Sequence, residues 1–210
     1  MKLTKLLWFS LLGILLLVFY FVLSPKSNSG DKGRVSSQAS VDLFTKQLAE
    51  QREKKNTFFK TSPDSPIENK AAFTVLSYYP VSSPYLVTAR FEPFADKTQK
   101  LVITLSDGSE ETYEKYGHAV FKLQGEVCRL LILKHDNIYS ILFKDKTSGK
   151  TTYAGGRYID LKENTFNGNG VEIDFNTAYN PYCVYNHTYA CPLPPAENTL
   201  PVAVGAGEKL

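Results

Sequence analysis

The fold is decided by residues 101–115, Leu101-Val-Ile-Thr-Leu-Ser-Asp-Gly-Ser-Glu-Glu-Thr-Tyr-Glu-Lys115. Two runs with the alternating pattern of β-strands flank a short segment that contains Asp107-Gly108. An Asp-Gly pair is typical of a hairpin turn, because both positions tolerate a positive φ. We therefore expect two antiparallel strands, 101–105 and 111–115, joined by a tight turn.

Short strands and turns continue on both sides of this hairpin. Residues 85–91 alternate in period two, and the further expected strands span 119–123, 127–133, 138–143 and 151–153. Within the second of these, four successive residues from Leu130 are apolar, so we expect that strand to be covered on both faces. This spacing predicts a mainly β domain, an antiparallel β-barrel or sandwich.

One soluble helix is expected before the strands, over residues 40–55. Ser40 can cap its first turn, and cations gather at its C-terminal end. The residues at three-to-four spacing are Val41, Phe44, Leu48 and Gln51. They predict a helix face packed on the β domain, and Pro63 and Pro66 forbid further helix.

An uncharged apolar run, residues 6–23, lies close to the N-terminus. A helix of this length is long enough to cross a bilayer, and Lys2 and Lys5 favour a cytoplasmic N-terminus. We therefore expect a cytoplasmic stub at 1–5, a transmembrane anchor at 6–23 whose partner is the lipid bilayer, and a flexible linker at 24–40. The alternative is a cleaved signal peptide, which the length of the run argues against.

The remaining residues, 41–210, suit one β-rich domain held outside the cytoplasm, on the periplasmic side in a Gram-negative cell. Two of the 24 Lys and Arg precede the apolar run, which leaves 22 against 21 acidic residues. Such a near-neutral domain gives no reason to expect a nucleic-acid partner. The sequence contains no catalytic triad, phosphate loop or metal-ligand spacing, so no cofactor and no metal are expected.

The C-terminal part carries a long signature. It contains residues 142–161, with Tyr-Ala-Gly-Gly-Arg-Tyr at their centre, followed by Asp174-Phe-Asn, Tyr179-Asn-Pro-Tyr-Cys183 and Cys191-Pro-Leu-Pro-Pro. With shorter upstream pieces, this signature resembles a bacterial family catalogued as domain of unknown function 1684, over about residues 44–209. The resemblance implies a β-rich domain, often secreted or membrane-attached, and no known activity, substrate or cofactor.

Polar side chains in this region lie between glycines and prolines, as they do where a rigid scaffold presents a site on loops. Two glycines before Arg157 let the backbone approach a ligand, and its guanidinium suits carboxylate or phosphate groups. The candidate ligand-binding residues are Arg157, Asp174, Asn176, Asn180, Glu197 and Asn198, with Tyr153 and Tyr179 at the rim. We expect them to form one pocket for a small polar or anionic molecule.

Two other hypotheses use the same residues. In the first, the domain is a hydrolase of ester or glycosidic bonds with Glu197 or Asp174 as the catalytic carboxylate. In the second, the cluster is a structural polar knot, in which Arg157 pairs with Asp174 or Glu197 and pins the C-terminal segment to the domain. A cavity at the cluster supports binding or catalysis, and a filled interior supports the knot.

The three cysteines divide by position. Cys128 lies in an apolar strand and is expected to pack as a small core residue. Cys183 and Cys191 are candidates for a disulfide outside the cytoplasm, and two packed free thiols are the alternative. His187 is the histidine nearest to them, and a lone histidine does not complete a zinc site.

Overall fold

The computed structural model describes residues 29–210, and their side chains from residue 41 onward. The predicted stub and anchor, 1–5 and 6–23, lie outside the described residues. Within the described part, no helix has both the length and the apolar content needed to cross a bilayer. The chain divides into two compact units, Met1–Leu43 and Phe44–Leu210, and the second holds every strand found among residues 29–210.

Helix α2 spans Ser29–Thr61, so it is longer at both ends than the predicted range and includes residues of the predicted linker. It ends before Ser62-Pro63, because a proline disfavours helical geometry at the residue that precedes it.

The face of α2 that packs on the β structure matches the predicted one only in part. Val41 and Gln51 are exposed, whereas Leu48 and Phe59 are buried. The contact stripe passes through Arg52 instead of its neighbour Gln51, because the Arg52 guanidinium donates hydrogen bonds to two backbone carbonyls of the β domain.

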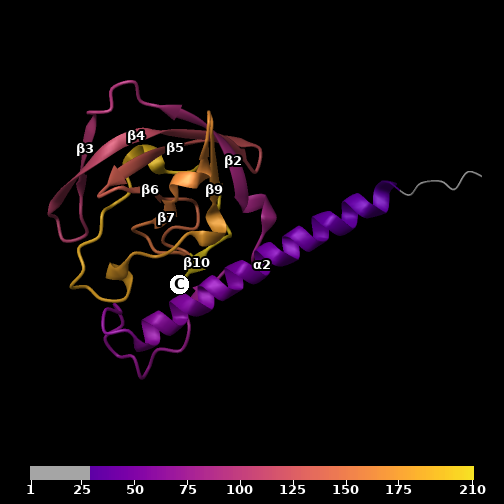
Figure 1. Ribbon diagram of the computed structural model, residues 1–210. Helices are drawn as coiled ribbons and strands as arrows, with labels where there is room; N and C mark the ends of the chain where they lie inside the picture. The colour runs from indigo at the N-terminus through magenta and orange to yellow at the C-terminus, as the bar shows by residue number, and fades with distance from the viewer. Residues whose placement is uncertain (1–28) are drawn as a thin grey trace, which may run out of the picture. The chain divides into compact units, whose positions relative to one another are not determined.

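Eight antiparallel strands form one sheet, in the order β7-β6-β5-β4-β2-β9-β8 with β3 paired to β4 (Figure 1). Their bounds are β2 (Leu86–Pro93), β3 (Lys100–Thr104), β4 (Glu110–Leu123), β5 (Glu126–His135), β6 (Ile138–Phe143), β7 (Arg157–Leu161), β8 (Phe166–Asn167) and β9 (Gly170–Asp174). A separate pair joins β1 (Ser77–Tyr78) to β10 (Glu208–Lys209), so the C-terminus returns to the segment that follows α2.

The hairpin predicted from residues 101–115 is confirmed. β3 pairs with β4 along its whole length, and the Leu105 N–H donates to the Ser109 carbonyl at 2.8 Å. Gly108 has a φ of +87°, which glycine adopts without strain.

The strand predicted at residues 151–153 is wrong, and the real strand lies later. Thr152 belongs to a turn, and its N–H donates to the Thr147 carbonyl at 3.2 Å. β7 begins at Arg157, so this side chain opens a strand instead of lying in a loop. Gly156 causes the change of direction, because it has a φ of +100° and lies so close to β6 that a Cβ would meet the Phe143 carbonyl at 2.6 Å.

The mainly β, antiparallel fold is as predicted, but the curled sheet does not close into a barrel, one of the two predicted forms, because its strand path ends at β7 and β8. An irregular segment occupies the outer edge of β7 instead, where Tyr158 and Tyr179 exchange two backbone hydrogen bonds of 2.9 Å. Residues 175–207 contain prolines and short 3-10 turns, so they cover this edge without forming a strand.

The main core lies inside the curl, where alternate residues of six strands meet. The C-terminal segment closes it with Leu200, Val202, Val204 and Ala206. On the other face of β5, Leu131 and Leu133 join a second apolar cluster. The prediction that residues 130–133 are covered on both faces is therefore confirmed, since all four have 0% exposure.

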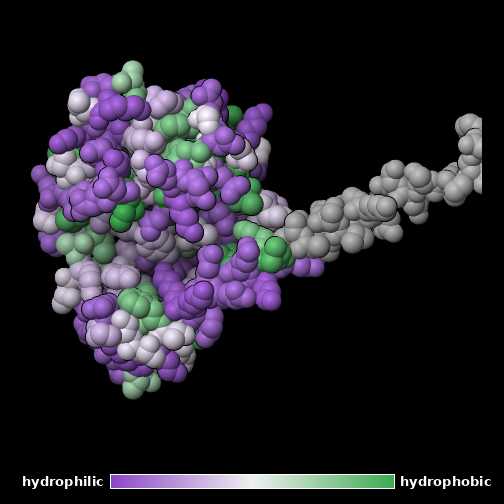
Figure 2. Space-filling model, in the orientation of Figure 1, coloured by the Kyte–Doolittle hydropathy of each residue, from purple (hydrophilic) through white to green (hydrophobic). Residues whose placement is uncertain are grey.

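The surface seen in Figure 2 is mostly hydrophilic, and its apolar groups are small and separate. Single exposed apolar side chains are normal on a soluble surface. On this face of the molecule we therefore expect a binding site in a cavity and not on an exposed apolar patch.

Candidate functional site

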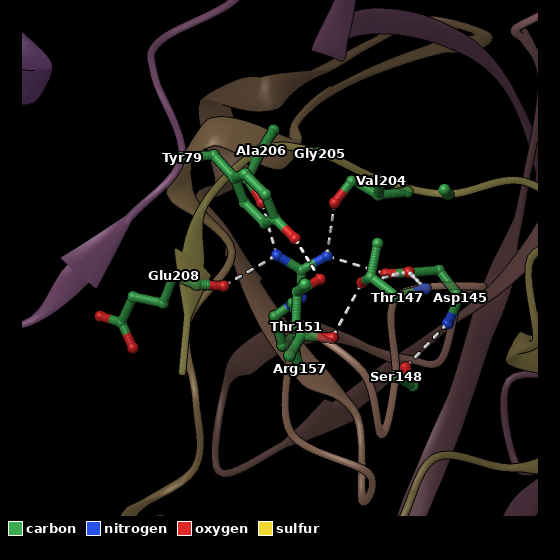
Figure 3. A network of polar contacts seen from close by, with 12 residues as sticks. Tyr79, Asp145, Thr147, Ser148, Thr151, Arg157, Val204, Gly205, Ala206 and Glu208 are labelled. Atoms are coloured by element: carbon green, nitrogen blue, oxygen red, sulfur yellow. Dashed lines mark hydrogen bonds and ion pairs between the residues drawn. The ribbon is translucent and has the colours of Figure 1, made fainter.

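Arg157, the first candidate residue, lies in the interior at 1% exposure. Its Nη2 donates to Asp145 Oδ2 at 2.7 Å and to the Val204 carbonyl at 2.9 Å. Its Nη1 donates to two more backbone carbonyls, those of Ala206 and Glu208. Figure 3 shows the guanidinium surrounded by these groups.

This network holds the C-terminal segment against β7, and its carboxylate is Asp145 instead of the expected Asp174 or Glu197. Thr147 fixes Asp145 in turn, with its N–H and its hydroxyl both donating to Oδ1. Each Nη atom of Arg157 already makes two hydrogen bonds, and the Nε is buried without a partner. Arg157 therefore has no free pair of donors for an external anion.

Asn198 is also structural. It lies at the end of η5 (Ala196–Asn198) with 0% exposure. Its Nδ2 donates to the carbonyls of Leu131 and Leu142 at 3.0 and 2.8 Å, and its Oδ1 accepts from the Leu131 N–H at 2.6 Å. This side chain fastens η5 across β5 and β6.

Asp174 and Asn176 form a second local brace. Asn176 is 1% exposed and exchanges two hydrogen bonds with the Ser82 backbone, of 2.9 and 3.0 Å. Asp174 accepts from the Asn176 N–H at 2.9 Å at the start of η3 (Phe175–Thr177). Burial raises the pKa of Asp174, although its hydrogen bonds from Asn176 act in the opposite direction.

Glu197 faces outward from η5 with 43% of its side chain exposed, and it accepts from His118 Nε2 at 2.9 Å. Arg129 Nη2 lies 2.9 Å from the other ring nitrogen of His118. Because a guanidinium can only donate, Nδ1 is the acceptor and Nε2 carries the proton. Glu197 thus bonds His118 and is not paired with Arg157.

Asn180 is 1% exposed, and its side-chain oxygen is buried without a partner. Its backbone N–H donates to Glu208 Oε2 at 2.8 Å. The Tyr153 hydroxyl lies against Cys183 Sγ at 4.0 Å. The predicted residues therefore support several separate parts of the fold, and Tyr179 is the one among them that lines the cavity described next.

A cavity of about 490 Å³, here named the tyrosine cleft, lies between α2, β7 and the segments after β9. Its lining residues are Lys55, Tyr158, Asp160, Tyr179, Pro181, Tyr182, Tyr189, Ala190 and Cys191. Tyr158 and Asp160 reach it together because alternate residues of a strand share a face, while Ile159 between them packs in the main core.

Asp160 is the carboxylate of the cleft. It is solvent-exposed, and the Tyr179 hydroxyl lies 3.0 Å from each of its carboxylate oxygens. The cleft walls partly desolvate it and raise its pKa, against the opposing effects of the Tyr179 hydrogen bond and the charge of Lys55. Burial also raises the pKa of Tyr158 and Tyr179, so both hydroxyls stay protonated and act as donors.

Lys55 is the cation of the cleft, and it already has a partner. Its ammonium forms an ion pair with Glu208, whose side chain is 2% exposed. Glu208 also accepts from the Asn180 N–H and from the hydroxyls of Tyr78 and Tyr185. The same ammonium lies 4.8 Å from the centre of the Tyr179 ring.

A smaller cavity of about 170 Å³ shares Tyr158, Asp160 and Tyr179 with the cleft. His135 and Ser140 are among its other lining residues. The two hollows therefore share a wall made of Asp160 and two tyrosines.

Cys183 and Cys191 are free, buried thiols, as is Cys128 in the core. The Cys183 N–H donates to Cys191 Sγ at 3.1 Å. Burial and the adjacent Cys183 thiol raise the pKa of Cys191 to about 12, so the cysteine that lines the cleft is protonated at neutral pH. In the described part of the chain, no group of three or more His, Cys, Asp or Glu side chains could hold a metal ion.

Sequence reasoning missed Lys55, Asp160 and Glu208. Asp160 had a usable signal, since a strand over 157–161 places residues 158 and 160 on one face. Lys55 belongs to a face of α2 that only the packed structure defines, and Glu208 lies two residues from the C-terminus with no local pattern around it.

These features define the class of the protein, a small antiparallel β domain whose irregular C-terminal segment closes its own core. The chain belongs to the family described as Protein of unknown function (DUF1684), whose model matches residues 71–209. The resemblance noted in the sequence is thereby confirmed. The match includes every strand and every lining residue of the tyrosine cleft except Lys55.

One solved structure with a similar fold is the solution NMR structure of an uncharacterized protein from Haloarcula marismortui. It is 32% identical, with a TM-score of 0.64, and the alignment covers 82% of this chain and 97% of that chain. No curated protein matches the chain at a significant level. Family and fold are therefore established, and function has to be argued from the site.

Proposed function

We propose that this domain binds a small, ring-containing polar molecule in the tyrosine cleft. The observation that carries the proposal is the lining of the cavity, with four tyrosines, one carboxylate and one ammonium around about 490 Å³. Aromatic walls with a few fixed polar groups are the usual form of small-molecule sites of this size. Tyrosine rings offer flat stacking area and a polar edge.

The walls of the cleft are fixed before any ligand arrives. The Tyr158 hydroxyl donates to the Pro192 carbonyl, and the Tyr179 hydroxyl donates to Asp160. Tyr182 packs edge-on against Tyr189, with ring centres 5.4 Å apart. A preformed site binds more tightly because fewer side chains lose freedom on binding.

The residues that suggested an anion pocket support a structural role instead. Arg157 and Asn198 use their donors within the fold, and neither lines the cleft. The hydrolase hypothesis has no supporting geometry, because Asp174 braces η3 and Glu197 bonds His118 away from the cleft lining.

We also propose that residues 6–23 hold the domain at a membrane, outside the cytoplasm. The support is the uncharged run itself, with lysines before it. Cell fractionation and protease treatment of intact spheroplasts test this. We expect the full-length chain in the membrane fraction with its domain accessible to protease, and a soluble or protected chain would contradict it.

Binding is tested by a thermal-shift screen of ring-containing small molecules, followed by titration of each hit. Tyr189→Ala should weaken a hit at least fivefold, because it removes one wall of the cleft. Phe58→Ala is the matched control, since Phe58 and Tyr189 are both 36% exposed and Phe58 does not line the cleft. Hits that respond equally to both variants, or no hits at all, would refute the proposal.

A further inference from the structure

Lys55 and Asp160, the two charged side chains that line the tyrosine cleft, differ in whether they have an ion-pair partner. Lys55 is neutralised by Glu208, which is nearly inaccessible and accepts three further hydrogen bonds. In the described part of the chain, Asp160 has no cationic side chain within ion-pair distance, and its carboxylate accepts from the neutral Tyr179 hydroxyl. The cleft therefore holds one carboxylate that has no ion-pair partner of its own among the described residues.

The aromatic walls, like the carboxylate, favour a positively charged ligand. Ring faces attract cations because the electron density of the ring lies above and below its plane. Lys55 shows this within the protein, with its ammonium 4.8 Å from the Tyr179 ring centre and 5.2 Å from that of Phe59. An anion in the cleft would instead meet Asp160 and the negative faces of the rings.

We propose that the ligand of the tyrosine cleft is an organic amine, whose primary ammonium donates to Asp160 while its apolar ring packs against Tyr182 and Tyr189. This inference rests on the proposed function and narrows it to one chemical class. The carboxylate oxygens of Asp160 keep lone pairs for N–H donors, since together they accept only the single hydroxyl proton of Tyr179. A charge-assisted bond of this kind is stronger than a bond between neutral groups.

Three probes of similar size separate the charge classes: 2-phenylethylamine, 2-phenylethanol and phenylacetate. We expect isothermal titration of the intact chain to show the amine binding at least tenfold more tightly than the alcohol, and phenylacetate binding most weakly. Asp160→Asn should bring the ratio of amine to alcohol affinity close to one. Asp64→Asn, an exposed aspartate outside the cleft lining, should leave that ratio unchanged.

A second measurement needs no variant. Because the cleft raises the pKa of Asp160, its carboxylate gains a proton as the pH falls toward that pKa, while the amine stays charged. The amine should therefore bind less tightly as the pH falls, and the affinity of the alcohol should change little.

The outcomes distinguish the two proposals. Equal binding of amine and alcohol, with both lost in Tyr189→Ala, would overturn the amine assignment and leave the cleft as a binding site. Preferential binding of phenylacetate, or a pH-independent affinity for the amine, would also overturn it. If none of the probes binds at millimolar concentration and the library screen is empty, the proposed function fails as well.

Discussion

The substitution Asp145→Asn tests the role of the Arg157 network most directly. It keeps the size and shape of the side chain, removes the negative charge that faces Arg157, and replaces one acceptor oxygen with an NH2 donor. Both side chains of this ion pair are 1% exposed, and Nη2 lies 2.7 Å from Oδ2. The variant therefore leaves a guanidinium in the interior without its counter-charge.

The loss of free energy of unfolding follows from the burial of the Asp145–Arg157 ion pair. Removing one partner of a buried ion pair destabilises a protein by about 3–5 kcal/mol. Three backbone carbonyls still accept from the guanidinium, so we expect the lower end, about 3 kcal/mol. In a domain of this size each kcal/mol lowers Tm by about 2–4 °C, which gives a loss of about 6–12 °C.

Thermal unfolding followed by circular dichroism measures this loss. Glu197→Gln serves as the comparison, because Glu197 is one of the two carboxylates expected beside Arg157 and its side chain is 43% exposed. The glutamine oxygen can still accept from His118 Nε2, so this variant should lose about 1 kcal/mol or less and melt within about 3 °C of wild type. If Asp145→Asn melts within 2 °C of wild type, or if Glu197→Gln loses as much, Asp145 is not the partner that holds Arg157.

Three further predictions concern the interior and the cleft. Asn198→Ala should cost about 3 kcal/mol in urea unfolding, because the amide groups of β5 and β6 that it bonds are buried; a loss below 1 kcal/mol would contradict its bracing role. The raised pKa of Asp160 means that the folded state binds the proton of this carboxyl group more tightly than the unfolded state does. Ionisation of Asp160 therefore lowers the free energy of unfolding once the pH rises above the unfolded pKa of about 3.9. Asp160→Asn should therefore raise Tm slightly at pH 7 and not at pH 3, and a gain confined to pH 3 would reverse the sign. Native reduced protein should react slowly with iodoacetamide at pH 8, and unfolded protein should take up three equivalents by mass spectrometry, because Cys128, Cys183 and Cys191 are buried; rapid labelling of the native protein would contradict this.

Local patterns determined the parts of the fold that the sequence predicted. The 101–115 hairpin could be predicted from its own turn residues, and the burial of residues 130–133 could be predicted from their unbroken apolar run. The limits of α2, and the fact that the sheet stays open instead of closing into a barrel, depend on contacts between residues far apart in the sequence, which no local pattern contains. Gly156 gave a local signal for a turn, but only its contact with the Phe143 carbonyl shows that the turn leads into a strand.

The candidate site shows the same division. The sequence indicated that Arg157 needs a partner if it is buried, because buried polar groups are paired, whereas Asn176 and Asn198 were expected to bind a ligand. It could not indicate which partners. Asp145 lies in what looked like an ordinary turn, and the Ser82 and Leu131 backbones are 94 and 67 residues away from the amides that bond them.

The polar residues near the C-terminus follow from how the core is closed. Val204 and Ala206 pack in the core but belong to no strand, so their carbonyls have no partner in a β-ladder. Buried carbonyls need donors, and Arg157 supplies them. The same irregular chain lies along the edge of β7 through Tyr179, and there its large side chains leave a hollow beside Asp160. An irregular closing segment therefore accounts both for the side chains that resemble a binding site and for the cleft that offers one.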